Sequence, residues 1–246
     1  MFSLLIAKWR VGFSFKCACR FILIFGARMT IYVKWLGHAS FQVRTTDKII
    51  YIDLKKYGKI IETSEKADII LVTHNHGDHC SPPKIQKLRK KDTVVVAPKN
   101  CAKRLGENVR SIKPRDETAI DSVRIEAVEA YNTKRFNPSG KPWHPKGYGV
   151  GYLIKAEGKT IYHAGDTDFI PEMCNLKNID LALLPTGDKY TMDNDEAAEA
   201  AIAIKPKTVM AMHTWEKDRA GFKKKIESNS KIQVIFLQEG EEYRLD

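Results

Sequence analysis

Eight consecutive residues, THNHGDHC from Thr73 to Cys80, constrain this chain more than any other stretch, because they hold three of its seven histidines. The residues before them, KADIILVT, are apolar and β-branched and predict a buried strand. The residues after them, SPPKIQKLRKK, predict a helix with Ser81 as N-cap and prolines in its first turn. The cluster is therefore expected on a loop at the carboxyl end of a strand, where layered α/β folds usually bind ligands.

The spacing H-x-H-x-D-H within this loop predicts a metal site. Imidazole nitrogen suits zinc and neighbouring transition metals, and a carboxylate can complete the ligand set. Later strand-like segments end in similar chemistry: YID ends at Asp53, IYHAGDTD runs from His163 to Asp168, and MAMHT reaches His213. Any one of these residues alone is more typical of a satisfied surface or capping residue. Their occurrence together predicts that several strand ends meet at one rim.

The apolar periodicity predicts two sheets that pack face to face with helices outside. Short strand-like segments come first (TIYVKWL, SFQVRT, KIIYID), and strand–helix alternation follows within each half. GVGYLIKAEGKTIYHAG predicts a hairpin, and DNDEAAEAAIAI predicts a helix with acids in its first turn. At 246 residues and 43% apolar, the chain can bury a full core. We expect one domain over residues 29–246, with no internal linker.

Residues 1–28 differ from the rest because they are apolar, aromatic and basic, with five basic residues and no acid. Charges interrupt the apolar runs too often for a spanning helix, and no small-residue cleavage site follows. Three interpretations remain: a translated upstream extension with Met29 as the working start, which we favour; an interfacial anchor, which would bring membrane contact; or an added element that packs on the domain.

Charge and cysteine usage narrow the class of protein. Of 41 basic residues, 36 lie after residue 28 against 30 acidic ones, so the predicted domain carries about +6. That excess favours a small anionic substrate, and no nucleic-acid-binding motif is visible. The five cysteines are odd in number and contain no C-x-x-C pair, which indicates a reducing, cytoplasmic location.

The motifs WLGHASF, YID, THNHGDH, HAGDTD, DLALLPTGDKYTM and MHT, in this order, resemble the metallo-β-lactamase superfamily. Within it, the chain is similar to the UlaG-like, NAPE-phospholipase-D-like group of metal-dependent hydrolases. The resemblance covers about residues 29–246. It implies an α/β (α+β) fold, the four-layer αββα sandwich, with two divalent ions between the sheets. Zinc is the default, and manganese or iron also suit mixed histidine and carboxylate ligands.

The resemblance also implies a role for each motif residue. His74 and His76 would bind the first metal, and Asp78, His79 and His213 the second, with Asp166 bridging the two. Asp53 matches an acid that supports the histidine loop, since a ligand imidazole needs its other nitrogen fixed by a carboxylate or carbonyl.

One position departs from the family pattern. Near the end of SVRIEAVEAY the family usually offers a third histidine for the first metal, but this chain has Asn132. Twelve residues on, His144 lies in the proline-stiffened segment GKPWHPKGYG. We favour His144 as the third ligand; Asn132 or water is the alternative.

The remaining candidates are weaker. His38 and Asn132 are possible substrate contacts, although His38 could equally cap its hairpin. His163 is expected to be structural, because strand alternation places it on the face opposite Asp166, and Cys80 is expected to be a small helix-entry residue. Basic and aromatic residues that could contact an anionic substrate are Lys134, Arg135, Lys146, Lys189 and Tyr190.

The function expected from this pattern is hydrolysis by a hydroxide that two divalent ions generate at neutral pH, with Asp78 or Asp166 as proton acceptor. The expected substrate is a phosphodiester or a lactone. Alternatives are a nuclease of the same fold, an oxygen-reducing diiron protein, or a non-catalytic metal-binding protein. The second of these would want a Glu where this chain has His76, and an added flavin domain. A homo-oligomer is possible.

Overall fold

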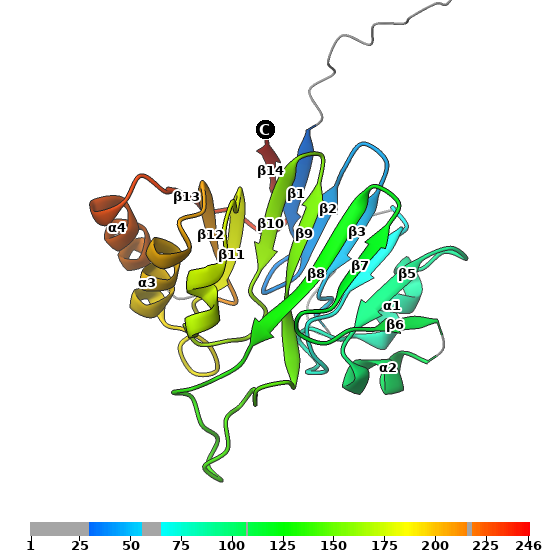
Figure 1. Ribbon diagram of the computed structural model, residues 1–246, viewed down its shortest axis with the longest axis horizontal. Helices are drawn as coiled ribbons and strands as arrows, with labels where there is room; N and C mark the ends of the chain where they lie inside the picture. Colours follow the sequence, from blue (N-terminus) through cyan, green and yellow to red (C-terminus); the bar gives the residue numbers. More distant parts are fainter. Residues whose placement is uncertain (1–29, 56–64, 107, 216–217) are drawn as a thin grey trace, which may run out of the picture.

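The computed structural model describes residues 30–55, 65–106, 108–215 and 218–246. Across these residues the chain forms two seven-stranded sheets packed face to face, with helices on the outer sides (Figure 1). This arrangement confirms the expected α/β (α+β) four-layer sandwich. The interpretations offered for residues 1–28 lie outside the described residues.

The first sheet has the order β14-β1-β2-β3-β4-β5-β6. Its strands are β1 (Ile31–Trp35), β2 (Phe41–Arg44), β3 (Ile49–Ile52), β4 (Ile69–Leu71), β5 (Val94–Ala97), β6 (Val109–Ser111) and β14 (Glu242–Leu245). Pairing is antiparallel from β14 to β3 and parallel from β3 to β6. Helices α1 (Pro82–Leu88) and α2 (Lys99–Leu105) belong to this half.

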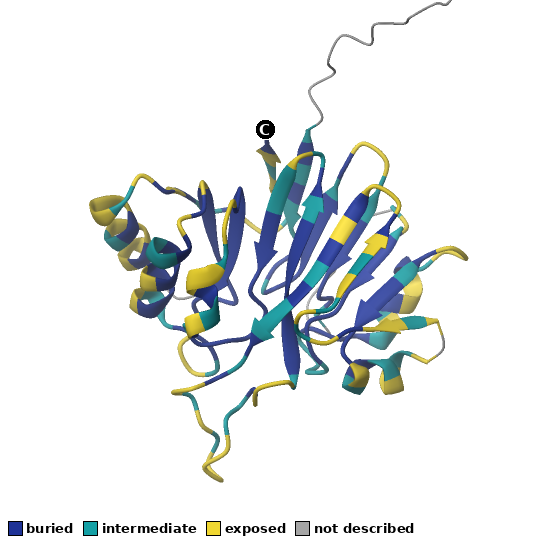
Figure 2. Cartoon of the chain, viewed as in Figure 1, coloured by how far each residue is buried: buried dark blue, intermediate teal, exposed yellow. Residues whose placement is uncertain are grey.

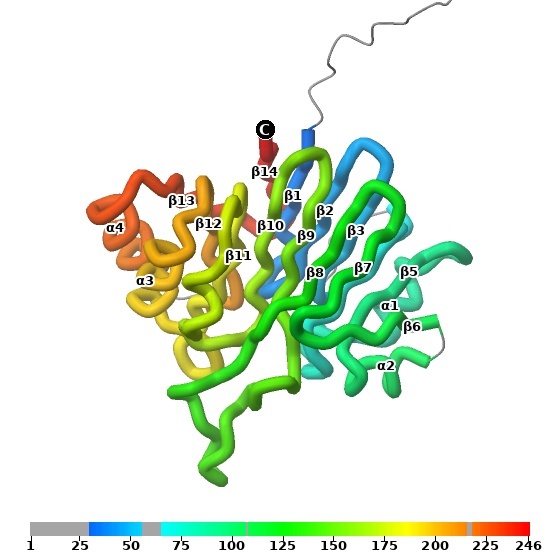
Figure 3. The backbone as a smooth tube through the Cα atoms, viewed as in Figure 1, coloured from blue at the N-terminus to red at the C-terminus, as the bar shows by residue number. Residues whose placement is uncertain are grey.

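The second sheet has the order β13-β12-β11-β10-β9-β8-β7. Its strands are β7 (Glu117–Ile120), β8 (Val123–Ala130), β9 (Gly149–Ala156), β10 (Lys159–His163), β11 (Leu181–Pro185), β12 (Thr208–Met212) and β13 (Gln233–Ile235). Helices α3 (Asn194–Ile204) and α4 (Ala220–Asn229) cover it, and a 3₁₀ helix, η1 (Pro171–Asn175), packs against α3. Figure 3 traces the β7–β8 and β9–β10 hairpins through this sheet.

Strand β4 shows why the apolar run before the histidine loop is continuous. Ile69 and Leu71 face the second sheet and join the main core, whereas Ile70 lies with Ile85 of α1 and Cys101 of α2 in a smaller core. A strand that is buried on both faces needs apolar residues at every position. Figure 2 shows the result, with buried strands between helices whose outer faces are exposed.

The parallel strands direct their following loops to the same edge. Strands β3 and β4 are parallel neighbours in one sheet, and β10, β11 and β12 are parallel neighbours in the other. The loops that carry Asp53, the THNHGDHC motif, Asp166 and His213 follow β3, β4, β10 and β12. The long segment between β8 and β9 extends at the lower edge of Figure 1. In the described part of the chain, no helix combines the length and apolar character needed to cross a bilayer.

Candidate metal centre

Asp53 fixes the histidine loop through hydrogen bonds to Thr73 and His79. This carboxylate is fully buried and accepts hydrogen bonds from the Thr73 amide (2.8 Å) and the Thr73 hydroxyl (2.7 Å). Its Oδ2 also lies 2.6 Å from His79 Nδ1. The loop then turns on itself, because the Cys80 amide donates to the His76 carbonyl at 2.8 Å. Asp53 thus holds His79 with its other nitrogen, Nε2, directed away from the carboxylate and available to a ligand.

Three histidines form what we call the first ligand group: His74, His76 and His144. His76 Nδ1 lies 3.1 Å from His74 Nε2 and 3.2 Å from His144 Nε2. Their candidate ligand atoms all lie within 4.8 Å of one another. The segment between β8 and β9 therefore folds back and brings His144 to the histidine loop.

The second ligand group is Asp78, His79 and His213. Asp78 Oδ2 lies 3.8 Å from His79 Nε2 and 3.7 Å from His213 Nε2. His38 joins this group more closely than expected for a substrate contact alone: its Nε2 lies 3.2 Å from Asp78 Oδ2, and its ring centroid lies 3.8 Å from that of His213.

Asp166 lies between the two groups. Its Oδ2 is 3.3 Å from His144 Nε2 and 3.2 Å from His213 Nε2, while its Oδ1 is 3.3 Å from His79 Nε2. Only 3% of its side chain is exposed. One carboxylate therefore faces ligand atoms of both groups, which is the geometry that a bridging ligand requires.

The donor atoms fit divalent metal ions. His79 Nε2, His213 Nε2 and Asp166 Oδ1 are buried, and none has a hydrogen-bond partner among the described residues. Buried polar atoms in native proteins are nearly always paired, so three unpaired atoms that converge need an explanation. Nitrogen and carboxylate donors are the ligands of zinc, manganese and iron, and a shared ion would satisfy all three atoms.

Burial and neighbouring charge shift the pKa values of the two groups in opposite directions. In the first group, burial lowers the pKa of His144 to about 4 and the pKa of His74 well below its usual value. In the second group burial also lowers the pKa values of the histidines, but nearby carboxylates raise them by more. Asp166 raises the pKa of His213 to about 9, and Asp166 and Asp53 raise the pKa of His79 well above its usual value.

Asn132 holds His144 in place. Its Oδ1 accepts hydrogen bonds from both Nδ1 and the backbone amide of His144, each at 2.8 Å. Its Nδ2 donates to Asp168 Oδ1 and to the Tyr190 carbonyl, each at 3.0 Å. Both amide atoms of this buried residue are therefore engaged within the protein. The geometry does not fit the expected role of Asn132 as a substrate contact, nor its alternative role as a ligand.

The expectation that Arg135 contacts substrate also needs correction. Its guanidinium is largely buried and pairs with Asp168 at 2.8 Å and with Glu196 at 2.5 Å. It supports the same carboxylate, Asp168, that binds Asn132. Lys134 and Lys146 are exposed and lie near Glu196 (3.2 Å) and Glu172 (2.7 Å).

His163 and Cys80 belong to neither ligand group. His163 Nε2 donates to the Ala39 carbonyl at 2.9 Å, and its Nδ1 accepts from the Gly165 amide at 3.2 Å. This pairing fits the structural role expected for it. Cys80 is buried at the entry to α1.

Asp168 was named with its strand end but given no role, although it lies two residues after Asp166 in HAGDTD, and no role was predicted for the rings of Trp143 and Trp215. Trp215 lies 4.8 Å from the His38 ring, centroid to centroid. Of the other expected substrate contacts, Lys189 lies over the ring of Tyr190, at 5.2 Å from its centroid.

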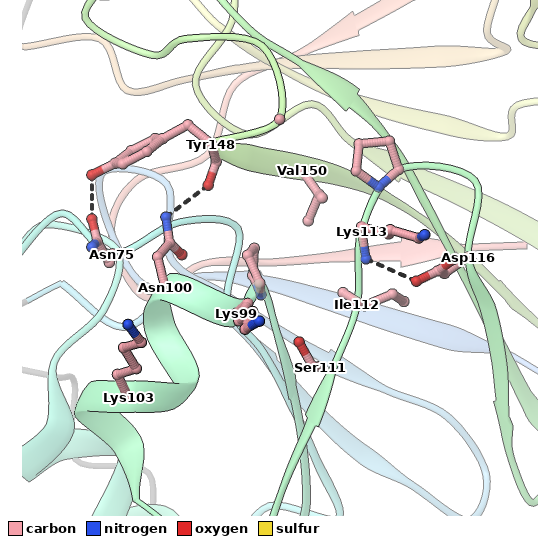
Figure 4. Close-up of a pocket in the computed structure, with 13 residues that line it drawn as sticks. Asn75, Lys99, Asn100, Lys103, Ser111, Ile112, Lys113, Asp116, Tyr148 and Val150 are labelled. Atoms are coloured by element: carbon pink, nitrogen blue, oxygen red, sulfur yellow. Dashed lines mark hydrogen bonds between the residues drawn. The ribbon is translucent and has the colours of Figure 1, made fainter.

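A pocket of about 660 Å³ lies behind the first ligand group (Figure 4). Tyr148 separates the two: its ring centroid is 5.5 Å from that of His76, and its hydroxyl bonds to Asn75, the residue between two histidines of the motif. The ionisable residues that line the pocket are Lys99, Lys103, Lys113 and Asp116. The pocket therefore carries a net positive charge.

Comparison with known families gives one clear match. Residues 32–213 match the model of the β-lactamase superfamily domain. A UPF0173 metal-dependent hydrolase from Pelotomaculum thermopropionicum is 34% identical over 227 residues, which cover 87% of this chain and 99% of the relative. Another, from Pyrococcus abyssi, is 36% identical over 234 residues, covering 87% of this chain and the whole relative.

Solved structures show the same relationship. A crystal structure of a putative metal-dependent hydrolase from Parabacteroides distasonis has a TM-score of 0.79 at 35% identity, covering 87% of this chain and 94% of that one. The metallo-β-lactamase fold protein YhfI from Bacillus subtilis has a TM-score of 0.69 at 12% identity, covering 88% and 99% of the two chains. The second comparison shows the shared fold alone.

Proposed function

Because this chain belongs to the metallo-β-lactamase superfamily and is a metal-dependent hydrolase, we propose that it uses two divalent ions to hydrolyse a small anionic ester, a phosphodiester or a lactone. The observation that carries this proposal is the position of Asp166 between two ligand groups, with oxygens 3.2–3.3 Å from nitrogens of both.

In this proposal each ligand group holds one ion. His74, His76 and His144 would hold the first and Asp78, His79 and His213 the second, while Asp166 faces both groups. Two such ions, zinc by default, would supply a hydroxide at neutral pH by lowering the pKa of water. Asp53 and Asn132 would orient His79 and His144 through the nitrogens that do not bind metal.

Asp78 is the better placed of the two expected proton acceptors. About a quarter of its side chain is exposed, whereas Asp166 is buried among the histidines. Asp78 Oδ2 also lies 3.2 Å from His38 Nε2, within hydrogen-bond distance of the ring nitrogen. Asp78 would therefore receive the proton that water releases, and His38 would hold the carboxylate in position.

An anionic substrate is supported by charge near the centre. Three lysines line the pocket of Figure 4, and none forms an ion pair with the described residues. With Asp116 as its one acidic lining residue, the pocket has an excess of positive charge, and such an excess concentrates ligands of the opposite sign.

Metal analysis followed by a hydrolysis screen tests the proposal. The purified protein should hold two ions per chain and should turn over at least one of a set of phosphodiesters and lactones. One ion per chain in a fully active protein would contradict the dinuclear mechanism. Two ions without hydrolysis of any compound in the set would contradict the proposed substrate class.

The charge argument has its own control. Replacing Lys99, Lys103 and Lys113 with Gln should raise KM for an anionic substrate and spare its neutral analogue. Replacing Lys223, Lys224 and Lys231, exposed lysines on and after α4, removes the same charge far from the pocket. Equal effects of the two triple variants would show that only overall charge matters.

A further inference from the structure

Three aromatic rings form a row beside the second ligand group. The ring centroids of Trp143 and Tyr190 are 4.8 Å apart, and those of Tyr190 and Trp215 are 6.4 Å apart. Both spacings lie within the range in which aromatic rings contact one another. We call these three residues the aromatic shelf.

Both the exposure and the backbone conformation of Trp215 are unfavourable for a residue without a function. Half of it (51%) is exposed, and it is one of two large apolar residues so exposed among those the structure describes. Its φ of +46° lies in the left-handed region, which bulky residues rarely adopt. Strained backbone of this kind persists where the surroundings enforce it, and it is concentrated at functional sites.

Gly187 leaves the space that Trp215 and His213 occupy. A Cβ at this position would lie 2.6 Å from the His213 carbonyl oxygen and 2.9 Å from Trp215 Cδ1. Any side chain there would displace the strand end that carries a metal-ligand candidate. The Trp215 ring can therefore lie close to the metal centre only because position 187 has no side chain.

The shelf contacts the second ligand group and is linked to the first through the backbone. Trp143 precedes His144 of the first group, and Trp215 follows His213 of the second group by two residues. The Trp215 ring centroid is 5.4 Å from that of His213. Tyr190 is held at its carbonyl by Asn132, the residue that orients His144. A ligand that contacts the shelf would therefore have its next atoms at the metal centre.

We propose that the aromatic shelf binds a planar apolar group of the substrate, so that this hydrolase prefers aromatic or conjugated groups next to the scissile bond. The inference rests on the proposed metal centre, which would hold the reacting group. The planes of Tyr190 and Trp215 are inclined by 57°, so a flat ring can stack on Trp215 with its edge toward Tyr190 and cover surface that water otherwise contacts. Lys189 Nζ, 5.2 Å from the centroid of the Tyr190 ring, suits an anionic substituent on the bound ring.

Two phosphonates test the shelf without any need for turnover. Methylphosphonate and phenylphosphonate offer the same group to the metal ions and differ only in the ring. Calorimetry on the metal-loaded protein should show that phenylphosphonate binds about tenfold more tightly or better, as expected for a ring that gains an aromatic partner and loses water. Trp215→Leu and Tyr190→Leu should each reduce this preference at least threefold and leave the affinity for methylphosphonate unchanged.

Phe136 supplies the matched control, because it is also half exposed and lies on the same segment as Trp143, without a ring contact to the shelf among the described residues. Phe136→Leu should keep the full preference for phenylphosphonate, and Trp215→Phe should keep most of it. Equal binding of the two phosphonates by the unaltered protein would overturn the shelf alone. Failure of both to bind would contradict the metal centre and, with it, the shelf.

Measuring the oligomeric state tests whether a second copy of the chain covers the aromatic shelf instead of a ligand. If Trp215→Leu converts a dimer to a monomer and leaves the phosphonate preference unchanged, the exposed rings are an interface between two copies of the chain. That outcome would also overturn the proposal.

Discussion

The two ligand groups share one loop but differ in charge. The first group consists of three imidazoles, and burial lowers the pKa values of all three, that of His144 to about 4. The second group mixes imidazole with carboxylate, and Asp166 raises the pKa of His213 to about 9 against the effect of burial. At neutral pH the first group is therefore neutral without an ion, whereas His79 and His213 of the second group are protonated.

This difference teaches how the two sites are prepared for metal. Ligands must be deprotonated before they bind an ion, so protonation and metal binding compete. The first group presents lone pairs that a buried, neutral environment has already freed. In the second group, His79 and His213 must release protons before an ion can bind. The same eight-residue motif thus contributes ligands to one site that can bind metal without losing protons and to another that must first release them.

The largest effect is expected from removing the group that the two sites share. Asp166→Asn keeps the size of the side chain but removes the charge that faces both groups. We expect fewer than one ion per chain and activity lower on the order of a thousandfold, beyond the roughly 10–100-fold effect typical of residues that only support ligands.

Asp180→Asn is the control, because Asp180 is also a buried carboxylate but pairs with Lys207 at 2.7 Å. Metal analysis should find its ion content unchanged. Two tightly held ions in Asp166→Asn would show that the groups are independent and would remove the reason for treating them as one centre.

A smaller effect should separate the groups. His144→Ala removes one of three ligands of the first group, while the second keeps its own three candidates. We expect the variant to retain about one ion and to lose activity by about a hundredfold, since two-ion catalysis needs both positions filled. His163→Ala also removes a buried histidine, one that pairs with a backbone carbonyl instead. That control should be less stable but should keep its full ion content, and full occupancy in His144→Ala would sink the assignment.

Asn132→Ala should have a weaker effect on the same group. The variant keeps His144 but frees its Nδ1, so the ring loses its fixed orientation. Affinity for one ion should fall about 10–100-fold, measured by competition with a chelator, and affinity for the other should stay the same. Asn137→Ala changes the same residue type in the same segment, where Asn137 bonds to Ser139. If the two variants behave alike, Asn132 does not position His144.

The sequence predicted those parts of the fold whose signal is local. The run before the histidine loop became β4 because every residue there is apolar and buried. Strands β6, β7 and β14 were missed because all three are short and largely exposed. Their order comes from backbone pairing with β5, β8 and β1, and such pairing leaves little trace in residue type.

The same distinction holds in the site. The motif in the histidine loop could be predicted because its ligand candidates are neighbours in the chain. His144 could be proposed only from a gap in the family pattern, and its support by Asn132 depends on a loop closing over twelve residues. Arg135 was misassigned because a charged loop residue is usually solvated, and only the fold reveals the two buried carboxylates that bind it.

The difference in charge between the groups predicts a difference in pH dependence. Without metal, His213 has a pKa of about 9, so near pH 7 it must release a proton before it can bind an ion. Below pH 9 the affinity of the second group should therefore fall with pH, by about tenfold per pH unit for each proton displaced from His213 and His79. His144, with a pKa of about 4, is already neutral, so the affinity of the first group should stay nearly constant between pH 8 and pH 6.

Calorimetry in buffers of different ionisation enthalpy measures this directly. One of the two ions should release protons at pH 7 from both His213 and His79, whose pKa values are raised, and the other close to none. His213→Ala should reduce the release, whereas His144→Ala should preserve it in the ion that remains. Equal release by both ions would mean that burial and carboxylates do not set the two groups apart. The contrast would then lie in the identity of the ligands and not in how they are charged before metal binds.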